Sequence, residues 1–524
     1  MSHPQTPTPA AKSEGLFQRF LDVVEIAGNK LPSPFVLFSL LAVVTLLLSA
    51  LFDGTAVSFA GKDSKLVTVK VVSLLTPEGF RYMITEMVPN FIKFPPLGLV
   101  VVMMLAMGLA ENTGFVSAFV RKAMLWAPPW AVTAMVFFLG INGNLASDAS
   151  MVFMPAAAAA VYAGMGRNPI LGMAIAFSAT AAGFSANMLP AGTDALIAGI
   201  TATAVKVIPQ TANSPVHMLI NYYFMSSSVV ILTVVGTIVA EKVVSPRLDR
   251  IFPDFKFDAG SGEDHRLTPE ENKGLRWAGW TALVYIALVL AMSVPELGLL
   301  RDAKTHAIVP KSPLLDGIIP ILFFFFMSVG IAFGLGKGVI KKEADVPKLM
   351  AQGLQGMTGF LVTAFAAAQF IAWFTKSNMA TILAVRGAEF LRDTGFTGIP
   401  LIICFMLLCG FVDLFMMSGS AKWLIMAPIF VPMFGLLGYE PALTQAAYRI
   451  GESVTNPISP LQYYVPVMLG IMSRYCKDES KVGMGTLMAT QMPFAIWLLI
   501  AWGAWLIFFM VMDLPLGPGV KIYL

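Results

Sequence analysis

The chain has 524 residues, of which 57% are hydrophobic and only 13% are charged, and its formal net charge is +4. Soluble globular proteins average about 45–50% apolar and about 25% charged residues, so this composition indicates a polytopic membrane protein rather than several soluble domains. The small net charge argues against nucleic acid as a partner. Three cysteines, all in or beside apolar segments, exclude a disulfide scaffold.

The apolar runs divide the chain. The first 30 residues are polar and lack a signal-peptide core. Residues 35–52 are uncharged and long enough to cross about 30 Å of hydrocarbon as a helix. Further apolar runs lie at about 95–120, 127–165, 169–205, 222–240, 277–294, 314–335, 350–374, 398–437, 441–472 and 487–512. We therefore expect a cytoplasmic N-terminal segment (1–34), a first transmembrane half (35–240), a cytoplasmic loop (241–276), a second transmembrane half (277–512) and a C-terminal tail (513–524).

Two of these runs, 127–165 and 398–437, are too long for a single crossing. Polar and small residues interrupt each near its middle, at 142–148 and at Ser418-Gly419-Ser420. Non-helical backbone is tolerated at membrane depth only where protein buries it or where it lines a cavity. Each run therefore predicts a re-entrant hairpin whose tip lies within the membrane.

This layout predicts an all-α polytopic membrane protein with nine transmembrane helices and two re-entrant hairpins. With the N-terminus in the cytoplasm, most Lys and Arg residues outside the membrane fall on the cytoplasmic side, as the positive-inside rule requires. The first hairpin then opens to the cytoplasm and the second to the outside. Residues 53–94 form an outside loop, in which 79–92 are weakly amphipathic and suited to the membrane interface.

The two hairpins and the runs after them resemble each other. Residues 147–155 read SDASMVFMP, and residues 420–428 read SAKWLIMAP. Downstream, Pro169 matches Pro441 and Asn187 matches Asn456, at an offset of about 270 residues throughout. Because the two copies enter the membrane from opposite sides, the pattern indicates an inverted-topology repeat.

Each copy also contains a helix that Gly, Pro, Ser and Asn interrupt, at 183–194 within the run 169–205 and at 451–460 within the run 441–472. Such breaks kink a packed helix or expose free backbone groups at mid-membrane, where half-helix dipoles converge. Hydroxyl, amide and carbonyl oxygens are hard ligands that suit Na⁺. The candidate Na⁺ ligands are Asn144, Ser147, Asn187, Ser418, Ser420 and Asn456.

Six charged residues lie in otherwise apolar segments, each at a cost of about 2.5–3.5 kcal/mol at a helix centre. They are Asp148, Asp194, Asp413, Lys422, Arg449 and Glu452. Arg449 is spaced to pair with Glu452 on one helix face. Asp194 is expected to pair across helices, as with Arg449, to take up a proton, or to cap the half-helix after the break.

Two neighbouring side chains at the second hairpin tip have alternative interpretations. Lys422 is long enough to extend its ammonium group toward the membrane interface. Trp423 is either a stacking surface for an aromatic ligand or a packed core residue.

Specific strings in the second half resemble the AbgT family, the p-aminobenzoyl-glutamate transporters. They are SGSAKW at 418–423 and AYRIG at 447–451, and the resemblance extends from Gly28 to about residue 510. It implies a homodimer in the bacterial inner membrane, with nine membrane helices and two re-entrant hairpins per subunit. It also implies Na⁺- or H⁺-coupled movement of p-aminobenzoyl-glutamate and, in some members, export of sulfonamide antimetabolites.

The same resemblance implies a set of substrate- and proton-binding positions. They are Asp194, Ser420, Trp423, Pro441, Arg449, Glu452 and Pro460. One position departs from the family pattern, since Glu452 stands where the family usually has Asp. The acid keeps its charge but extends one methylene further, which affects any tight coordination of an ion.

The functional hypothesis is a cation-coupled secondary transporter in which Arg449 binds a substrate carboxylate, Trp423 stacks on the aromatic ring and Asp194 carries a proton. Its alternatives are a Na⁺-coupled transporter of another small carboxylate and a channel. A channel needs a continuous polar path, whereas these polar residues cluster at mid-membrane. An enzyme is disfavoured because the four His residues lie in tails and loops, and the sequence contains no Ser–His, paired-Asp or zinc pattern.

Overall fold

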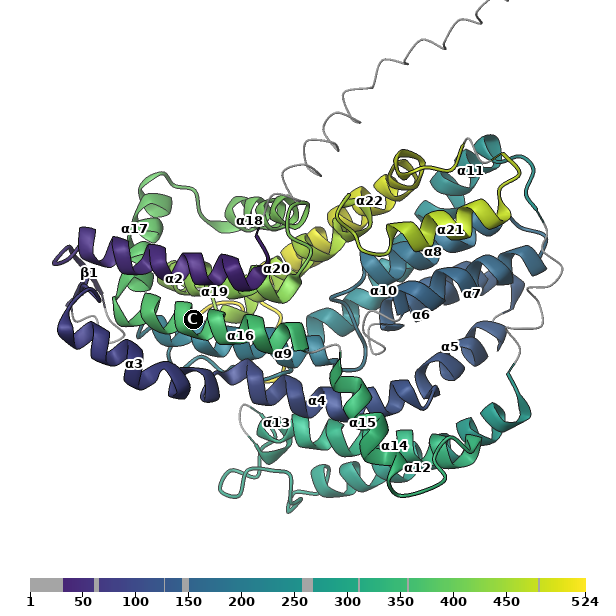
Figure 1. Ribbon diagram of the computed structural model, residues 1–524, viewed down its shortest axis with the longest axis horizontal. Coiled ribbons are helices and arrows are strands. Elements are labelled where there is room, and N and C mark those ends of the chain that lie inside the picture. The colour runs from purple at the N-terminus through teal and green to yellow at the C-terminus, as the bar shows by residue number, and fades with distance from the viewer. Residues whose placement is uncertain are drawn as a thin grey trace, which may run out of the picture.

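The computed structural model describes residues 32–60, 66–126, 128–143, 150–256, 267–309, 312–355, 358–478 and 481–524. The fold is 73% helix and 3% strand (Figure 1). The first half contains α2 (Pro34–Leu51), β1 (Ala56–Ala60), β2 (Leu66–Lys70), α3 (Pro77–Ile92), α4 (Pro95–Asn112), α5 (Phe115–Trp126), α6 (Val132–Asn142), α7 (Ser150–Gly164), α8 (Pro169–Ala181), α9 (Gly192–Ala204), α10 (Tyr222–Val239) and α11 (Ser245–Ile251).

The second half repeats the helical character. It contains α12 (Pro269–Ser293), α13 (Pro313–Asp316), α14 (Ile318–Lys337), α15 (Asp345–Gln355), α16 (Thr358–Lys376), α17 (Met379–Asp393), α18 (Gly398–Asp413), α19 (Gly419–Leu436), α20 (Pro441–Val454), α21 (Val465–Tyr475) and α22 (Met484–Val511). Short 3₁₀ turns flank several of these helices, at Pro129–Ala131, Val205–Val207 and Asn456–Ile458, and a π-helical turn joins α10 to α11 at Ala240–Val244.

Eight helical stretches of the described chain are long and apolar enough to cross a membrane. They are Pro34–Leu51, Pro77–Asn112, Tyr222–Ile251, Pro269–Ser293, Ile318–Lys337, Thr358–Lys376, Gly419–Leu436 and Met484–Val511. This supports a multi-pass membrane protein, while the nine crossings expected from the sequence stay a prediction.

The segments expected to form hairpins each contain two short helices. In the first, α6 ends at Asn142 and α7 begins at Ser150, with residues 144–149 outside the described part of the chain. In the second, the helix is interrupted between Asp413 and Gly419. With 11 residues in α6, 15 in α7 and 16 in α18, these helices rise about 17–24 Å, less than the roughly 30 Å of a bilayer core. Ser418 caps α19, because its Oγ accepts from Ala421 N at 3.3 Å. The lengths of α6, α7 and α18 favour helices that return without crossing, whereas α19, with 18 residues, is long enough to span a membrane. The two re-entrant hairpins therefore stay a prediction.

Most of each expected helix break lies outside α-helix, although residues 192–194 belong to α9 and residues 451–454 to α20. The backbone leaves α8 after Ala181 and re-enters α-helix at Gly192, and it leaves α20 after Val454 and re-enters at Val465. Both α8 and α20 begin with a proline, whose missing N–H costs nothing in the first helical turn. The matched elements of the two halves therefore begin and end at corresponding places.

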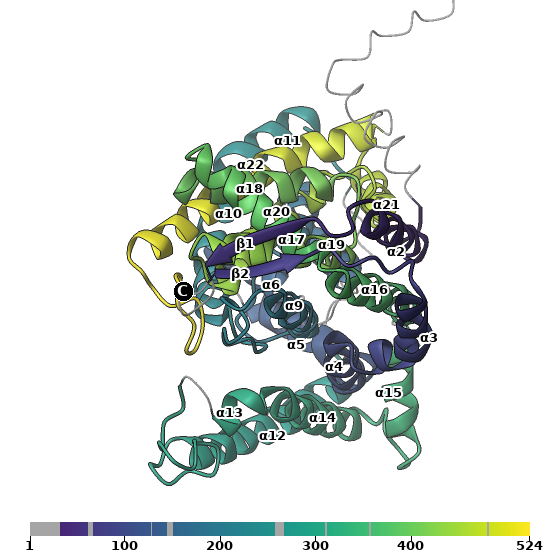
Figure 2. The same ribbon diagram turned by 90° about the vertical axis from the view of Figure 1, so that its left-hand side faces the viewer.

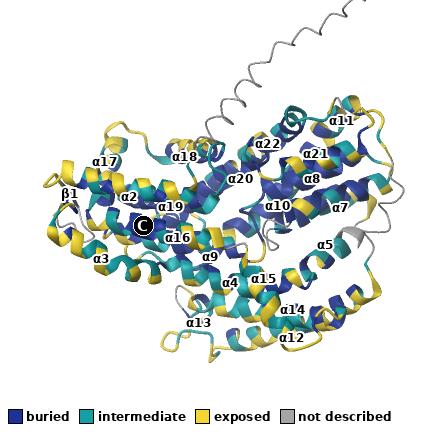
Figure 3. Cartoon of the chain, in the orientation of Figure 1, coloured by how far each residue is buried: buried dark blue, intermediate teal, exposed yellow. Residues whose placement is uncertain are grey.

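The helices form a core and a peripheral layer. Figures 1 and 2 show α12, α13 and α14 side by side, apart from most of the fold and next to α4 and α5. An ion network joins this layer to α5, since Arg121 Nη2 and Lys337 Nζ lie 2.8 and 3.1 Å from the same Glu271 oxygen. Burial concentrates in α8 and α20, which are buried throughout, and in α9 and α19, whereas the outer helices are largely exposed (Figure 3).

A β-hairpin in the segment 53–94 was not expected from the sequence. Strands β1 and β2 pair antiparallel, with Ala56 opposite Lys70 and Ala60 opposite Leu66. The residues after this hairpin form α3, which packs against α16, because Asn90 Nδ2 donates to Gln369 Oε1 at 3.2 Å. The weakly amphipathic stretch 79–92 is thus helical.

The shared carboxylate of Glu271 yields a prediction for the peripheral layer. Replacing it by Gln removes the charge that Arg121 and Lys337 share in a mostly buried place, with 6% of the acid side chain exposed. We expect Glu271→Gln to lower the free energy of unfolding by about 1–3 kcal/mol, measured as a lower thermal midpoint in detergent. Glu270→Gln, at the exposed neighbouring position, is the control. Equal midpoints for the two variants would contradict the role of the network.

Candidate functional site

The two broken helices meet at their breaks. Asn456 Nδ2, in the second break, donates to the carbonyl of Ala181 at the end of α8, over 3.3 Å. Ser185 Oγ, in the first break, donates to Glu452 Oε1 at 2.9 Å. Segments about 270 residues apart therefore form one polar centre inside the helical core, as the inverted repeat predicts.

An ion pair crosses this centre. Arg449 Nη2 on α20 lies 2.6 Å from Asp194 Oδ1 on α9 and also donates to Ser185 O at 2.5 Å. The other Asp194 oxygen accepts from Asn187 Nδ2 and from the backbone N–H of Ala191, at 2.8 and 2.7 Å. Asp194 thus accepts the backbone N–H of Ala191 at the start of α9 and also pairs with Arg449 on another helix. Of the two interpretations for Arg449, the cross-helix pair is confirmed and the i,i+3 pair with Glu452 is wrong.

A second ion cluster holds the tip of the second hairpin. Lys422 Nζ contacts Asp413 Oδ1 and lies 3.5 Å from Glu452 Oε2, and none of the three side chains is more than 3% exposed. Asp413 also accepts from Thr455 Oγ1 at 2.7 Å. The expectation that Lys422 extends to the membrane interface is wrong, because two carboxylates offset its charge within the protein.

Trp423 is fully buried and packed. Its ring stacks on that of Tyr448, with centroids 4.4 Å apart at 28°, and its Nε1 donates to Thr201 Oγ1 at 2.9 Å. Thr201 Oγ1 in turn donates to Gln445 Oε1 at 2.6 Å. This geometry matches the packed-core interpretation, since Tyr448 covers one ring face. Ligand stacking by Trp423 stays a prediction.

The sequence did not single out Tyr448, Thr201 or Gln445. Each is an uncharged residue, and although Tyr448 adjoins Arg449 in the AYRIG string, its type and spacing do not predict its contacts. Their importance follows only from the contact between α9, α19 and α20, which brings residues from both halves together.

The candidate Na⁺ ligands divide into two groups. Asn144 and Ser147, like Asp148, lie outside the described residues. Asn187 and Asn456 donate through their amide nitrogens, so a cation would approach their oxygens, while Ser418 Oγ lies 3.4 Å from Ser420 Oγ at the hairpin tip. In the described part of the chain, no cluster of three or more His, Cys, Asp or Glu side chains is arranged to hold a metal ion.

A cavity of about 470 Å³ reaches the tip of the second hairpin. Ser418 and Pro460 line it together with Met417, Gln462 and Tyr463, and the start of α2 forms another wall. Pro441, by contrast, is buried at the first turn of α20. Ser418 is a candidate Na⁺ ligand and Pro460 a predicted substrate-binding position. Both therefore line the same open cavity.

Comparison with known proteins places these features in a family. Residues 19–524 match the family model described as "AbgT putative transporter family". The chain is 37% identical over 500 residues to the p-aminobenzoyl-glutamate transport protein of Escherichia coli (strain K12), covering 95% of this chain and 96% of that protein.

Two solved structures share the fold. The YdaH transporter of Alcanivorax borkumensis, described as having an unusual topology, superposes with a TM-score of 0.86 at 33% identity, covering 93% of this chain and all of that one. MtrF of Neisseria gonorrhoeae, described as illuminating a class of antimetabolite efflux pumps, superposes with a TM-score of 0.88 at 36% identity, covering 96% of this chain and all of that one.

The buried Lys422 cluster yields a stability prediction. Lys422→Met leaves Asp413 and Glu452 without their shared ammonium group, and breaking such a buried pair costs about 3–5 kcal/mol. We expect a large fall in the thermal midpoint of the purified protein, partly restored by adding Asp413→Asn. Lys304→Met, at an exposed loop position, should leave the midpoint unchanged. An unchanged midpoint for Lys422→Met would show that the cluster contributes little.

Proposed function

The chain belongs to the AbgT family, and from this membership we propose that it is a cation-coupled secondary transporter of p-aminobenzoyl-glutamate or a related aromatic carboxylate. The curated relative that is 37% identical is named for transport of p-aminobenzoyl-glutamate, and it matches nearly the full length of this chain. The residues at the two helix breaks support the finer parts of the proposal.

The proposed substrate class rests on the surroundings of Arg449. Its guanidinium is 1% exposed at the meeting point of the two breaks, and its Nε has no hydrogen-bond partner among the described residues. Thr193 Oγ1, next to Asp194 in the chain, is likewise buried and unpartnered in the described structure. Because buried polar atoms in native proteins are nearly always paired, these two support a ligand that completes the site.

A substrate carboxylate is the group that suits Arg449. Guanidinium groups bind carboxylates through two parallel N–H···O bonds. The glutamate part of p-aminobenzoyl-glutamate supplies two carboxylates, and one of them would compete with Asp194 for Arg449. Trp423 is fully buried, so it would contact the aromatic ring only once the packing on the face away from Tyr448 opens.

The charge balance supports cation coupling. Among the described residues at the breaks, three acids (Asp194, Asp413 and Glu452) face only two cationic groups (Lys422 and Arg449). An entering carboxylate makes this buried region still more negative, and uncompensated charge is costly in a protein interior. Na⁺ or H⁺ moving with the substrate restores the balance. The proposed Na⁺ ligands within the described residues are Asn187, Ser418, Ser420 and Asn456. Asn144 and Ser147, which lie outside the described residues, complete the proposed set.

The assembly and orientation extend the proposal. The protein would work as a homodimer in the bacterial inner membrane, with its N-terminus in the cytoplasm. The separate layer of α12, α13 and α14 is the part of the fold best suited to a fixed frame, against which the core moves to expose the site alternately to each side.

Export of antimetabolites such as sulfonamides is a second candidate activity. The structural relative from Neisseria gonorrhoeae, 36% identical to this chain, is described as illuminating antimetabolite efflux pumps. Arg449 does not fix the direction of transport for a carboxylate substrate, because it would bind that group whichever side the substrate enters from. The ion gradients decide between import and export.

Radiolabelled flux into proteoliposomes tests the assigned residues. We expect Arg449→Ala and Asp194→Asn to reduce gradient-driven p-aminobenzoyl-glutamate transport at least tenfold, because one loses the carboxylate partner and the other loses the charge that the cation offsets. Arg81→Ala, at an exposed position of α3, is the matched arginine control. Full transport by both site variants would refute these roles.

Separate ion gradients test the coupling. An inward Na⁺ gradient or an inward H⁺ gradient, imposed singly at zero membrane potential, should change the initial rate at least fivefold for whichever ion is coupled. Liposomes without protein report leakage. Identical rates under both gradients and under none would contradict cation coupling while leaving substrate transport intact.

A further inference from the structure

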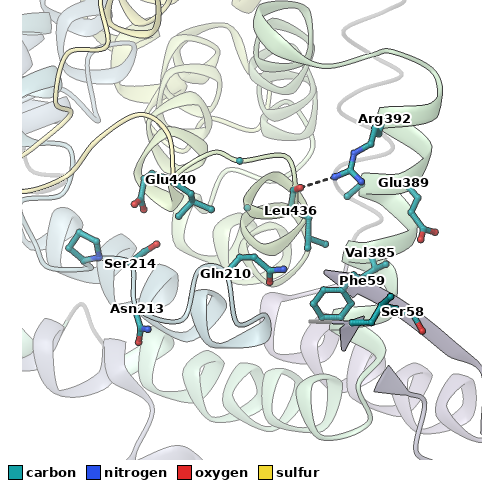
Figure 4. A pocket seen from close by; sticks show the side chains of 16 residues that line it. Ser58, Phe59, Gln210, Asn213, Ser214, Val385, Glu389, Arg392, Leu436 and Glu440 are labelled. Carbon is teal, nitrogen blue, oxygen red and sulfur yellow. Dashed lines mark hydrogen bonds between the residues drawn. The ribbon is translucent and has the colours of Figure 1, made fainter. Parts of the chain in front are cut away.

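A second cavity, of about 740 Å³, lies away from the helix breaks. Its walls come from five parts of the fold: the β1–β2 hairpin, the segment that follows α9, helix α17, the joint between α19 and α20, and residue Leu524 (Figure 4). Ligand pockets for drug-sized molecules span about 300–1,000 Å³, so this cavity is large enough for a small organic ligand.

One end of the cavity presents a guanidinium group. Arg392 on α17 points toward the end of α19, where its Nη2 donates to Leu436 O at 3.0 Å (Figure 4). That is its one hydrogen bond within the described part of the chain, and a guanidinium has five N–H groups. Glu389, one turn earlier, pairs with Arg386 at 3.1 Å. Arg392 therefore keeps donors for an anionic group.

The remaining walls complement a ligand with an apolar body and a polar far end. Phe59, Val385 and Leu436 lie on the side of Arg392, and Ser214 lies across the cavity beside Glu440 (Figure 4). The Ser214 hydroxyl oxygen is buried and has no hydrogen-bond partner among the described residues. A buried hydroxyl without a partner favours a ligand group that donates or accepts there.

We propose that this cavity is a second binding site for the aromatic carboxylate that the protein carries, a proposal that rests on the proposed function. The carboxylates bind Arg392, the ring packs against Phe59 and Leu436, and the aniline N–H group of p-aminobenzoyl-glutamate donates to Ser214. Along the ligand the order is carboxylates, ring and amine. Across the cavity the matching order is Arg392, then Phe59 and Leu436, then Ser214.

The position of the cavity separates it from the Arg449 site. Helix α19 has 18 residues and rises about 27 Å, from the Lys422 cluster near its start to Leu436 at its end. Glu440 immediately precedes α20, the helix of Arg449 and Glu452. A ligand here contacts the far ends of both helices that form the central site. In the topology predicted from sequence, this is the outer face, where substrate loads or leaves.

Equilibrium binding of radiolabelled p-aminobenzoyl-glutamate to the full chain in nanodiscs tests the second site. We expect two sites per chain, of which Arg449→Ala removes one. In that background, Arg392→Gln should weaken the remaining site at least tenfold, and Arg392→Lys less. Arg81→Gln, at an exposed arginine of α3 that does not line the cavity, is the control, because Arg386 pairs with Glu389 of the cavity wall.

The outcomes separate this proposal from the proposed function. If Arg449→Ala abolishes all binding, or if Arg392→Gln and Arg81→Gln bind alike, the second site is refuted while transport stands. If the unmodified protein binds no p-aminobenzoyl-glutamate, both are overturned. In vesicles of each orientation, Arg392→Gln should raise KM at least threefold only for substrate offered on the predicted outer side. An equal KM on both sides would contradict the placement.

Discussion

The ion pair between Arg449 and Asp194 is the contact on which the centre of this protein depends. Each residue comes from a different half of the chain, and each lies beside a helix break. Placing either charge alone in a membrane core is costly, so the pair forces the two breaks to lie together. Ser185 extends the contact, because it joins Arg449 through its carbonyl and Glu452 through its hydroxyl.

The same pair explains how one site could serve both substrate and ion. In the proposed mechanism, a carboxylate that binds Arg449 would weaken its hold on Asp194, and the negative charge then released would attract a cation. The second hairpin is tied to this event through Lys422, which contacts both Asp413 and Glu452. Movement of the hairpin and a change in charge at the breaks are therefore linked through the same few side chains.

Much of this arrangement follows from local sequence signals. Prolines at Pro169 and Pro441 mark where helices begin, and polar residues within apolar runs mark where they stop. Arg449 and Asp194 are conspicuous because charge is rare in membrane segments. The pairing of Lys422 with Asp413 and Glu452 was not predictable, since several acids were available and only the packing of α18, α19 and α20 brings these two beside it. The β-hairpin escaped notice because its strands have five residues each.

The central claim is that the two halves are coupled through Arg449 and Asp194. A double-mutant cycle on the thermal stability of the purified protein, using Asp194→Asn, Arg449→Gln and the double variant, measures that coupling directly. We predict that the two substitutions are strongly non-additive, with an interaction free energy of about 1–3 kcal/mol. Additive effects would show that the two residues do not stabilise each other, and would contradict the account.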